Sequence, residues 1–407
     1  LWLTKFTNRN KKPEKTFCGT ESRSLRTPST DTTKHIATMN HPIRFTTPEE
    51  AVKVIKSGDH VHLSSVASVP QILVRAMTAR GEAGELQHVH IHHLHTEGEA
   101  LYAVPEMEGI FQLDSFFVGG NVRNITQQGF ADYIPVFLSE TQRLYRDGIL
   151  PCNVAMIQVS TPDRHGYVSL GTSVDATLAA VECADTVIAV VNRHVPRSFG
   201  DSFIHTSQID LFVEDDTPLI EEHFAEPNDL ECAIGRNCAA LIEDGACLQM
   251  GIGAIPNAVL SQLGSHKNLG VHTEMFADGV LPLVESGVIN GANKKIDKGK
   301  MVSTFLMGSH RVYDFIDNNP GVLMKDVGYT NDPFVIAQNP KVTAINSALQ
   351  IDLTGQICAD SLGTRFYSGV GGQVDFTNPN ISTLGGYIES GDVKPLAVFS
   401  NERMEAY

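Results

Sequence analysis

The chain has 407 residues, of which 42% are hydrophobic and 19% charged, so it can bury a sizeable core and is long enough for two domains. Its formal net charge of -16 argues against broad binding to nucleic acid or to an anionic membrane, because both surfaces repel an acidic protein. No apolar run approaches the roughly 20 residues that span a bilayer. We therefore expect a globular protein with a small-molecule site, and neither nucleic acid nor membrane as a partner.

The N-terminal 38 residues are rich in Ser, Thr, Lys and Arg and show little hydrophobic periodicity, which predicts a disordered leader over 1–38. Its Arg and Ser content resembles an organelle transit peptide, but Glu14, Glu21 and Asp31 are unusual in one. The seven cysteines are scattered and odd in number, which is typical of reduced thiols in a cytoplasmic protein. The cytoplasm is therefore the expected compartment, with the mitochondrion as the alternative.

Helices and strands alternate from residue 47 onward. A capping box with proline at the first helical position, 47–50, predicts a short helix over 51–56. A strand over 60–65, a helix over 71–79 and a strand over 89–94 follow. This alternation indicates βαβ units and a mainly parallel sheet.

An internal echo organises the chain. Residues 61–70 run in step with residues 247–256, and both segments predict a strand, a turn and a helix that proline opens. Each leads to a strand that finishes in His-Thr-Glu, at 95–97 and at 272–274. The echo predicts an α/β fold with two related open-sheet domains in tandem. The expected domains are 39–226 and 227–376.

Glu274 is the residue best placed for catalysis. It follows the predicted strand 269–273, and ligands of open α/β sheets bind beyond the carboxyl ends of the strands. A carboxylate can attack a thioester, because the resulting anhydride conserves most of the thioester's energy. The alternative is an ordinary loop residue, and Glu97 occupies the matching place in the first domain.

Two glycine-containing segments support a catalytic role for Glu274. The segment 249–256 is a strand that turns sharply into a helix, where backbone N–H groups can hold a phosphate, a pantetheine amide or a thiolate. The segment 368–376 offers consecutive N–H groups suited to an oxyanion hole. Both are also compatible with plain turns. The first domain has Ser-Val-Ala at 65–67 in place of the glycines, which makes Glu97 a weaker rival.

Seven ordered segments between residues 39 and 376 carry a family resemblance. They are 117–121, 158–167, 200–205, 251–256, 272–275, 304–308 and 369–376. Together they resemble the acetyl-CoA hydrolase and CoA-transferase family, most closely its 4-hydroxybutyrate and butyryl-CoA:acetate CoA-transferase branch.

The resemblance implies a function and a set of site residues. Glu274 would be the nucleophile of a ping-pong CoA transfer between a short-chain acyl-CoA and a carboxylic acid, with Gly371 and Gly372 as oxyanion donors. The residues expected to contact CoA are Gln249, Met250, Gly251, Ile252, Gly253, Asn346, Gly369 and Gly372. His95, His272 and Ser160 are expected to line the substrate cleft. CoA enters as a substrate; no permanent cofactor and no metal is expected, and the chain is expected to form a homo-oligomer.

The sequence departs from the family after residue 376. Residues 377–407 form a divergent tail, and 384–398 resembles a fragment of bacterial tricarboxylate-binding transport proteins. We therefore expect the second domain to be cut short at its C-terminus, which leaves an inactive remnant as one alternative. A second alternative is an acetyl-CoA hydrolase, in which water replaces the carboxylic acid.

Two further patterns imitate other functions. Gly251-x-Gly253 followed by an acid resembles a dinucleotide-binding fingerprint, but the third glycine is missing. The strand 89–95 places His88, His90 and His92 on one face, at a spacing too wide for compact tetrahedral metal ligation. We expect these histidines to lie in the core or to line the cleft.

Overall fold

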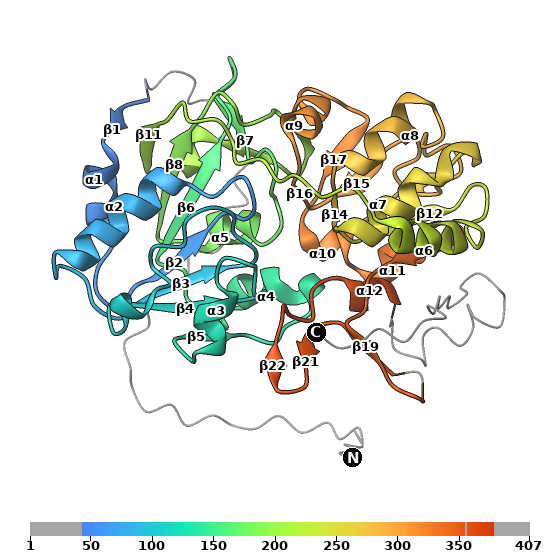
Figure 1. Cartoon of the computed structure of the whole chain (residues 1–407). Helices are drawn as coiled ribbons and strands as arrows, with labels where there is room; N and C mark the ends of the chain where they lie inside the picture. Colours follow the sequence, from blue (N-terminus) through green and yellow to red (C-terminus); the bar gives the residue numbers. More distant parts are fainter. Residues whose placement is uncertain (1–42, 355, 378–407) are drawn as a thin grey trace, which may run out of the picture. The chain divides into compact units, whose positions relative to one another are not determined.

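The first half of the protein is built on an eight-stranded sheet in which every neighbouring pair is parallel (Figure 1). The computed structural model describes residues 43–354 and 356–377. In spatial order the strands are β1 (Phe45–Thr46), β11 (Leu211–Glu214), β8 (Thr186–Val191), β6 (Val154–Val159), β2 (His60–Leu63), β3 (Val89–His93), β4 (Phe111–Ser115) and β5 (Ala131–Tyr133). The predicted α/β class with a parallel open sheet is confirmed.

Helices cover both faces of this sheet. Val61 and Leu63 of β2 belong to the same buried cluster as Met77 of helix α2, whereas His62 between them points to the other face and bonds Tyr145 and Thr177 of two other helices. The helices are α1 (Pro48–Ala51), α2 (Gln71–Glu82), α3 (Arg123–Gln127), α4 (Thr141–Arg146) and α5 (Thr177–Cys183). A short antiparallel pair, β7 (Tyr167–Ser169) and β10 (Phe203–His205), stands apart from the sheet.

The second half contains a shorter set of parallel strands. Their pairing runs β18 (Val342–Ile345), β12 (Cys247–Met250), β13 (Gly270–Val271), and then β15 (Met301–Ser303), β17 (Val322–Met324) and β9 (Phe199–Gly200). A parallel bridge between His272 and Val302 joins the two groups. Beyond it, β14 (Met275–Phe276) pairs with β16 (Phe305–Leu306).

The remaining elements surround these strands. The helices are α6 (Asp229–Ala239), α7 (Ala254–Ser261), α8 (Leu281–Glu285), α9 (His310–Ile316), α10 (Val327–Thr330), α11 (Pro333–Ile336) and α12 (Gln373–Thr377). Two antiparallel hairpins pair β19 (Gln350–Ile351) with β20 (Ile357–Cys358), and β21 (Ser361–Leu362) with β22 (Arg365–Phe366). Short 3-10 turns are η1 (Val52–Val54), η2 (Pro105–Met107), η3 (Leu138–Glu140), η4 (Thr206–Gln208), η5 (Leu263–Ser265) and η6 (Asp278–Val280).

The internal echo corresponds to matching structure. In each half a strand, β2 or β12, leads through a turn into a helix, α2 or α7, and then into the parallel neighbour β3 or β13. Each first strand also has a second parallel neighbour that comes much later in the chain, β6 or β18. The two halves therefore repeat one βαβ arrangement.

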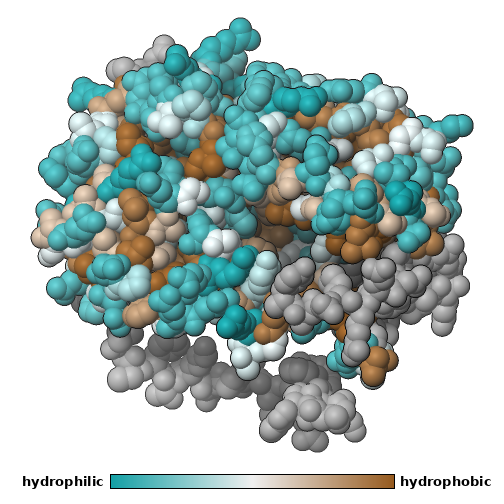
Figure 2. All heavy atoms as spheres, viewed as in Figure 1, coloured by the Kyte–Doolittle hydropathy of each residue, from teal (hydrophilic) through white to brown (hydrophobic). Residues whose placement is uncertain are grey.

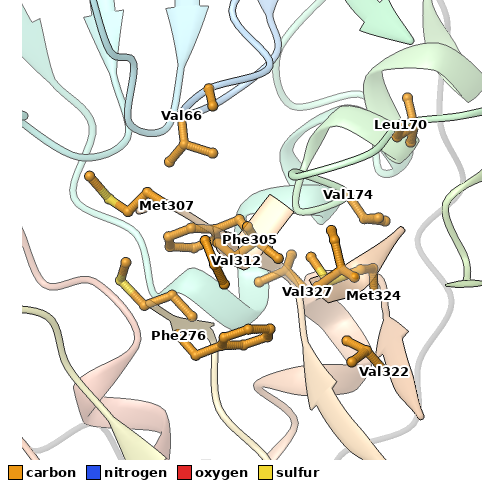
Figure 3. Packing of buried hydrophobic residues seen from close by; sticks show 14 of the residues in the cluster. Val66, Leu170, Val174, Phe276, Phe305, Met307, Val312, Val322, Met324 and Val327 are labelled. Atoms are coloured by element: carbon orange, nitrogen blue, oxygen red, sulfur yellow. The ribbon is translucent and has the colours of Figure 1, made fainter. Parts of the chain in front are cut away.

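The core is shared between the halves. Figure 3 shows Val66, Leu170 and Val174 of the first half beside Phe305 and Met324 of the second, and all of them belong to one buried cluster. Strand β9, from the first half of the sequence, pairs with β17 of the second. The domain boundary near residue 227 stays a prediction, but the packing crosses it.

Several helices and strands begin or end at residues that differ from the sequence prediction. The first helix is α1 followed by the 3-10 turn η1, rather than a helix over 51–56, although Thr47 caps it as expected by accepting from the Glu50 N–H (3.3 Å). Helix α2 continues three residues past 79, and in this added turn Gly81 allows a close approach to the Phe111 ring, since a methyl group there would lie 2.6 Å from it. His88 is exposed, with a φ of 54°, and lies before β3, so the prediction that it shares a core or cleft-lining face with His90 and His92 is wrong.

Hydrophilic residues cover most of the face drawn in Figure 2, and hydrophobic ones gather in small groups. No helix within 43–354 and 356–377 has the length and apolarity to cross a membrane. The cysteines of these ranges are all free thiols. The expected leader (1–38) and nearly all of the expected tail (377–407) lie outside the described residues, so the expected truncation of the second domain stays a prediction.

Candidate active site

Glu274 sits in the short break between β13 and β14. Its main-chain carbonyl accepts hydrogen bonds from the Thr304 N–H (3.0 Å), the Phe305 N–H (3.1 Å) and the Ser303 hydroxyl (3.0 Å). These three donors fix the backbone at the point where the chain passes from one strand to the next. The Glu274 side chain is only 7% exposed, so the carboxyl group is held in a largely dry position.

An amide pair holds the carboxyl group. Gln249, at 0% exposure on β12, points its Nε2 at both carboxyl oxygens of Glu274 (3.1 and 3.2 Å) and also donates to Oδ1 of Asn346 (3.0 Å). Asn346 returns a bond from Nδ2 to Gln249 Oε1 (2.8 Å). The parallel pairing of β12 with β18 brings Asn346 to this place, one residue beyond the end of its strand. Three predicted site residues thus form one hydrogen-bonded chain.

Burial dominates the electrostatics of this carboxyl group. It raises the pKa of Glu274 to about 7, and the nearby negative charge of Asp375 acts in the same direction, while the bond from Gln249 opposes the shift. In its ionised form, a carboxylate with a raised pKa and little solvation is a stronger nucleophile than one in water. The perturbed pKa is therefore consistent with a catalytic role.

The glycine-rich loop packs directly on Glu274. A methyl group on Gly372 would lie 3.2 Å from Glu274 Cδ, so a side chain at this position would crowd the carboxyl group and the loop comes close to it only because residue 372 is glycine. Residues from the first half hold the loop: Val370 N–H donates to the Tyr133 hydroxyl (2.9 Å), and Leu138 N–H donates to Gly371 O (3.3 Å). Within the described ranges, the N–H groups of Gly371 and Gly372 donate to no other group, which leaves them available to a bound oxyanion.

Asp375 anchors this loop, a role that the sequence reasoning missed. Its carboxylate accepts from the Ser139 N–H (3.1 Å), the Ser139 hydroxyl (2.8 Å) and Asn331 Nδ2 (3.0 Å). Burial raises its pKa. The available signal was an acid three residues after Gly372, inside the glycine-rich motif, but only the fold reveals its partners.

The turn after β12 is open where its counterpart in the first half is closed. Gly251, Ile252 and Gly253 are all partly exposed, and a methyl group on Gly253 would meet nothing within 4 Å. Gly253 has a φ of 106°, a conformation that favours glycine. In the first half, residues 65–67 are buried, at 2% exposure or less. Met250 at the end of β12 is buried, and its N–H donates to Thr273 Oγ1 (3.0 Å).

The three residues predicted for the substrate cleft lie in different surroundings. His95 is partly exposed and bonds Glu97 (Nε2 to Oε1, 2.6 Å). His272 is 2% exposed and bonds the carbonyl oxygen of Thr330 (2.9 Å), and burial lowers its pKa to about 4. Ser160 is buried in a turn, where its hydroxyl accepts from the Ser169 N–H (2.8 Å). None of the hydrogen bonds or ion pairs found in the described part of the chain joins any of the three to Glu274.

Comparison with known proteins shows the family. Models of the acetyl-CoA hydrolase/transferase N-terminal and C-terminal domains match residues 30–221 and 308–387. A 4-hydroxybutyrate coenzyme A transferase from Clostridium kluyveri is 46% identical over 82% of this chain and 77% of its own length. The chain belongs to the acetyl-CoA hydrolase/transferase family.

Two further similar proteins agree with this assignment. A succinyl-CoA:acetate/propanoyl-CoA:succinate CoA transferase from Fasciola hepatica is 46% identical over 83% of this chain and 70% of its own length. The crystal structure of RipA from Yersinia pestis superposes with a TM-score of 0.78, at 34% identity, over 82% of this chain and 78% of that one. The family resemblance drawn from the sequence is confirmed, and the chain is an enzyme of the CoA-transferase type.

Proposed function

We propose that this enzyme moves CoA between a short-chain acyl-CoA, such as an acetyl, butyryl or 4-hydroxybutyryl thioester, and a carboxylic acid such as acetate, with Glu274 as the nucleophile. The observation that carries the proposal is the setting of the Glu274 carboxyl group. It is buried, it is oriented by Gln249, and Gly372 lies so near that an added methyl group would come within 3.2 Å of its carbon. The names of the relatives support the substrate class.

The proposed reaction has four displacements. A Glu274 oxygen attacks the thioester carbonyl carbon and the C–S bond breaks. CoA leaves as a thiolate, and a mixed anhydride of Glu274 and the acyl group remains. The thiolate then attacks the carbonyl carbon of Glu274 and releases the first carboxylate, which leaves a glutamyl-CoA thioester. The acceptor carboxylate attacks that thioester and expels the thiolate. The thiolate finally attacks the acceptor's carbonyl and restores Glu274.

The surrounding residues fit the needs of these steps. The free N–H groups of Gly371 and Gly372 would stabilise the oxyanion that forms in each displacement, a device worth roughly 100- to 1000-fold per donor. The Gln249 amide holds both carboxyl oxygens, so Glu274 is oriented before attack. The partly exposed glycines 251 and 253 would give room to the pantetheine arm of CoA, most clearly at Gly253, where an added methyl group meets nothing within 4 Å.

The dry surroundings of Glu274 favour transfer over hydrolysis. A glutamyl-CoA intermediate survives until a carboxylate arrives only if water is kept from its carbonyl carbon. The low exposure of Glu274 and the close approach of the loop at Gly372 support that exclusion. An acetyl-CoA hydrolase is the second candidate, because the family contains both activities and a single admitted water would convert one into the other.

Trapping tests the proposal. The protein is incubated with butyryl-CoA, treated with hydroxylamine or borohydride, digested, and mapped by mass spectrometry. We expect the modification on the peptide that carries Glu274, and none in Glu274→Gln. An unmodified Glu274 peptide in a protein that turns over butyryl-CoA would refute the nucleophile. Turnover measured with and without acetate then separates transferase from hydrolase, and absence of any turnover supports the inactive remnant.

A further inference from the structure

A second cluster of ligand-type side chains lies on the main sheet. His60 of β2, His90 of β3 and Asp114 of β4 are each half-buried, and one donor atom from each lies within 4.8 Å of the others. The His60 and His90 rings stack with centroids 4.4 Å apart, and His90 Nδ1 lies 2.7 Å from Asp114 Oδ2. No other group of this kind occurs among residues 43–354 and 356–377.

Strand register brings these residues together. His60 pairs with His90, and His92 pairs with Asp114, so alternation along the strands puts all four on the same face, the one covered by α4 and α5. The histidines of β3 alone are spaced too widely to share a metal ion. The neighbouring strands supply the missing ligands, which a spacing argument along a single strand does not reveal.

The geometry suits a tetrahedral transition metal. Bonds of about 2.0–2.2 Å from zinc to imidazole nitrogen or carboxylate oxygen place adjacent ligand atoms about 3.3–3.6 Å apart in a tetrahedron. The separations here bracket that value, from 2.7 Å to at most 4.8 Å. Small side-chain rotations would therefore be enough. Two nitrogens and one carboxylate favour a first-row transition metal over magnesium or calcium, which prefer oxygen ligands.

His92 supplies a supporting contact. Its Nε2 lies 3.0 Å from His60 Nδ1 and 3.5 Å from Asp114 Oδ2. The ring is completely buried, so its position is fixed by the core. A buried side chain that hydrogen-bonds metal ligands fixes their orientation, as the outer partners of metal ligands commonly do.

We propose that His60, His90 and Asp114 bind a divalent transition metal, zinc by preference, that joins strands β2, β3 and β4. Three protein ligands leave the fourth tetrahedral position to water. The residues lie on a different sheet from Glu274, and His60 stands at the start of β2, whereas the turn that matches the one beside Glu274 follows the end of that strand. The metal would therefore stabilise the fold and take no part in CoA transfer.

Metal titration of the full, tag-free chain tests this. After dialysis against a chelator, zinc is titrated in competition with a chromophoric chelator, and cobalt(II) is used as a spectroscopic probe. We expect one zinc per chain, a raised unfolding midpoint, and the visible absorption of tetrahedral cobalt. His90→Gln and Asp114→Asn should each weaken zinc binding by at least about tenfold.

The matched control is His310→Gln, which removes an exposed histidine beside Glu221 (3.3 Å) outside the cluster and should leave binding unchanged. Wild-type protein that binds no zinc at micromolar concentrations, or binds cobalt without the tetrahedral spectrum, would overturn the proposal, even if a variant fails to fold. Equal zinc affinity in wild type, His90→Gln and Asp114→Asn would overturn it as well.

Discussion

Burial of the Glu274 carboxyl group has a cost that depends on pH. Its pKa in the folded protein, about 7, lies above its ordinary value of 4.5, so the folded state binds a proton that the unfolded chain has released between these values. The stability that this proton contributes to the folded state is complete below pH 4.5 and is lost as pH rises through 7. The difference between the two pKa values lowers the free energy of unfolding by about 3 kcal/mol at alkaline pH, relative to acid pH.

Glu274→Gln should therefore abolish transfer and yet stabilise the fold at pH 8, because the neutral amide carries no ionisation cost. At pH 5 the two proteins should be nearly equal in stability. Urea unfolding at both pH values measures this. Glu97→Gln, which removes a partly exposed acid bonded to His95, is the control and should show no gain at pH 8. The same gain at both pH values would contradict the burial argument.

Asp375 should tune the nucleophile through its charge. Its negative charge raises the pKa of Glu274, although desolvation contributes more. The acid limb of kcat/KM for acyl-CoA should rise with pH as Glu274 ionises in the free enzyme. In Asp375→Asn that limb should move to lower pH, since the repulsion is gone. A profile that only falls in height, without moving, would leave Asp375 a purely structural role.

One added methyl group tests whether the position of the glycine-rich loop matters for catalysis. In Gly372→Ala the new atom would lie 2.6 Å from Asn331 Nδ2 and 3.2 Å from Glu274 Cδ. The loop must then move off the carboxyl group, so we expect kcat to fall by about 100-fold, as when an oxyanion donor is lost, with little change in fold. Gly264→Ala, which meets nothing within 4 Å, should leave kcat unchanged. Steady-state kinetics with circular dichroism distinguish these outcomes.

Element by element, the sequence predicted what depends on local pattern. Strands β2 and β3 and helix α2 were found because apolar periodicity and a proline mark them, and the echo placed β12 beside Glu274. Strand β9 was missed, because a two-residue strand has no periodicity and exists only through its pairing with β17. Asp375 and the His60–Asp114 cluster were missed for the same reason, since their partners lie on elements distant in sequence.

At the scale of the whole molecule, the two halves should unfold together. One buried cluster contains residues of both, and Arg146 of α4 bonds Asp326 beside α10 (2.8 Å). The β9–β17 pairing adds backbone hydrogen bonds between them. A chain built from two independent domains would instead show two transitions.

Gly200 on β9 is the position where one substitution tests this. A methyl group there would lie 2.3 Å from the main-chain oxygen of Met324, at a φ of 105° that already disfavours side chains. Gly200→Ala should keep a single calorimetric transition and lower the free energy of unfolding by more than about 2 kcal/mol. Gly109→Ala is the control, because its φ of 77° carries a similar backbone cost with nothing within 4 Å, and it should cost only about 1 kcal/mol. If Gly200→Ala split the transition in two, the pairing of β9 with β17 would be what couples the two halves. An unchanged midpoint would mean that this pairing contributes little to the stability of either half.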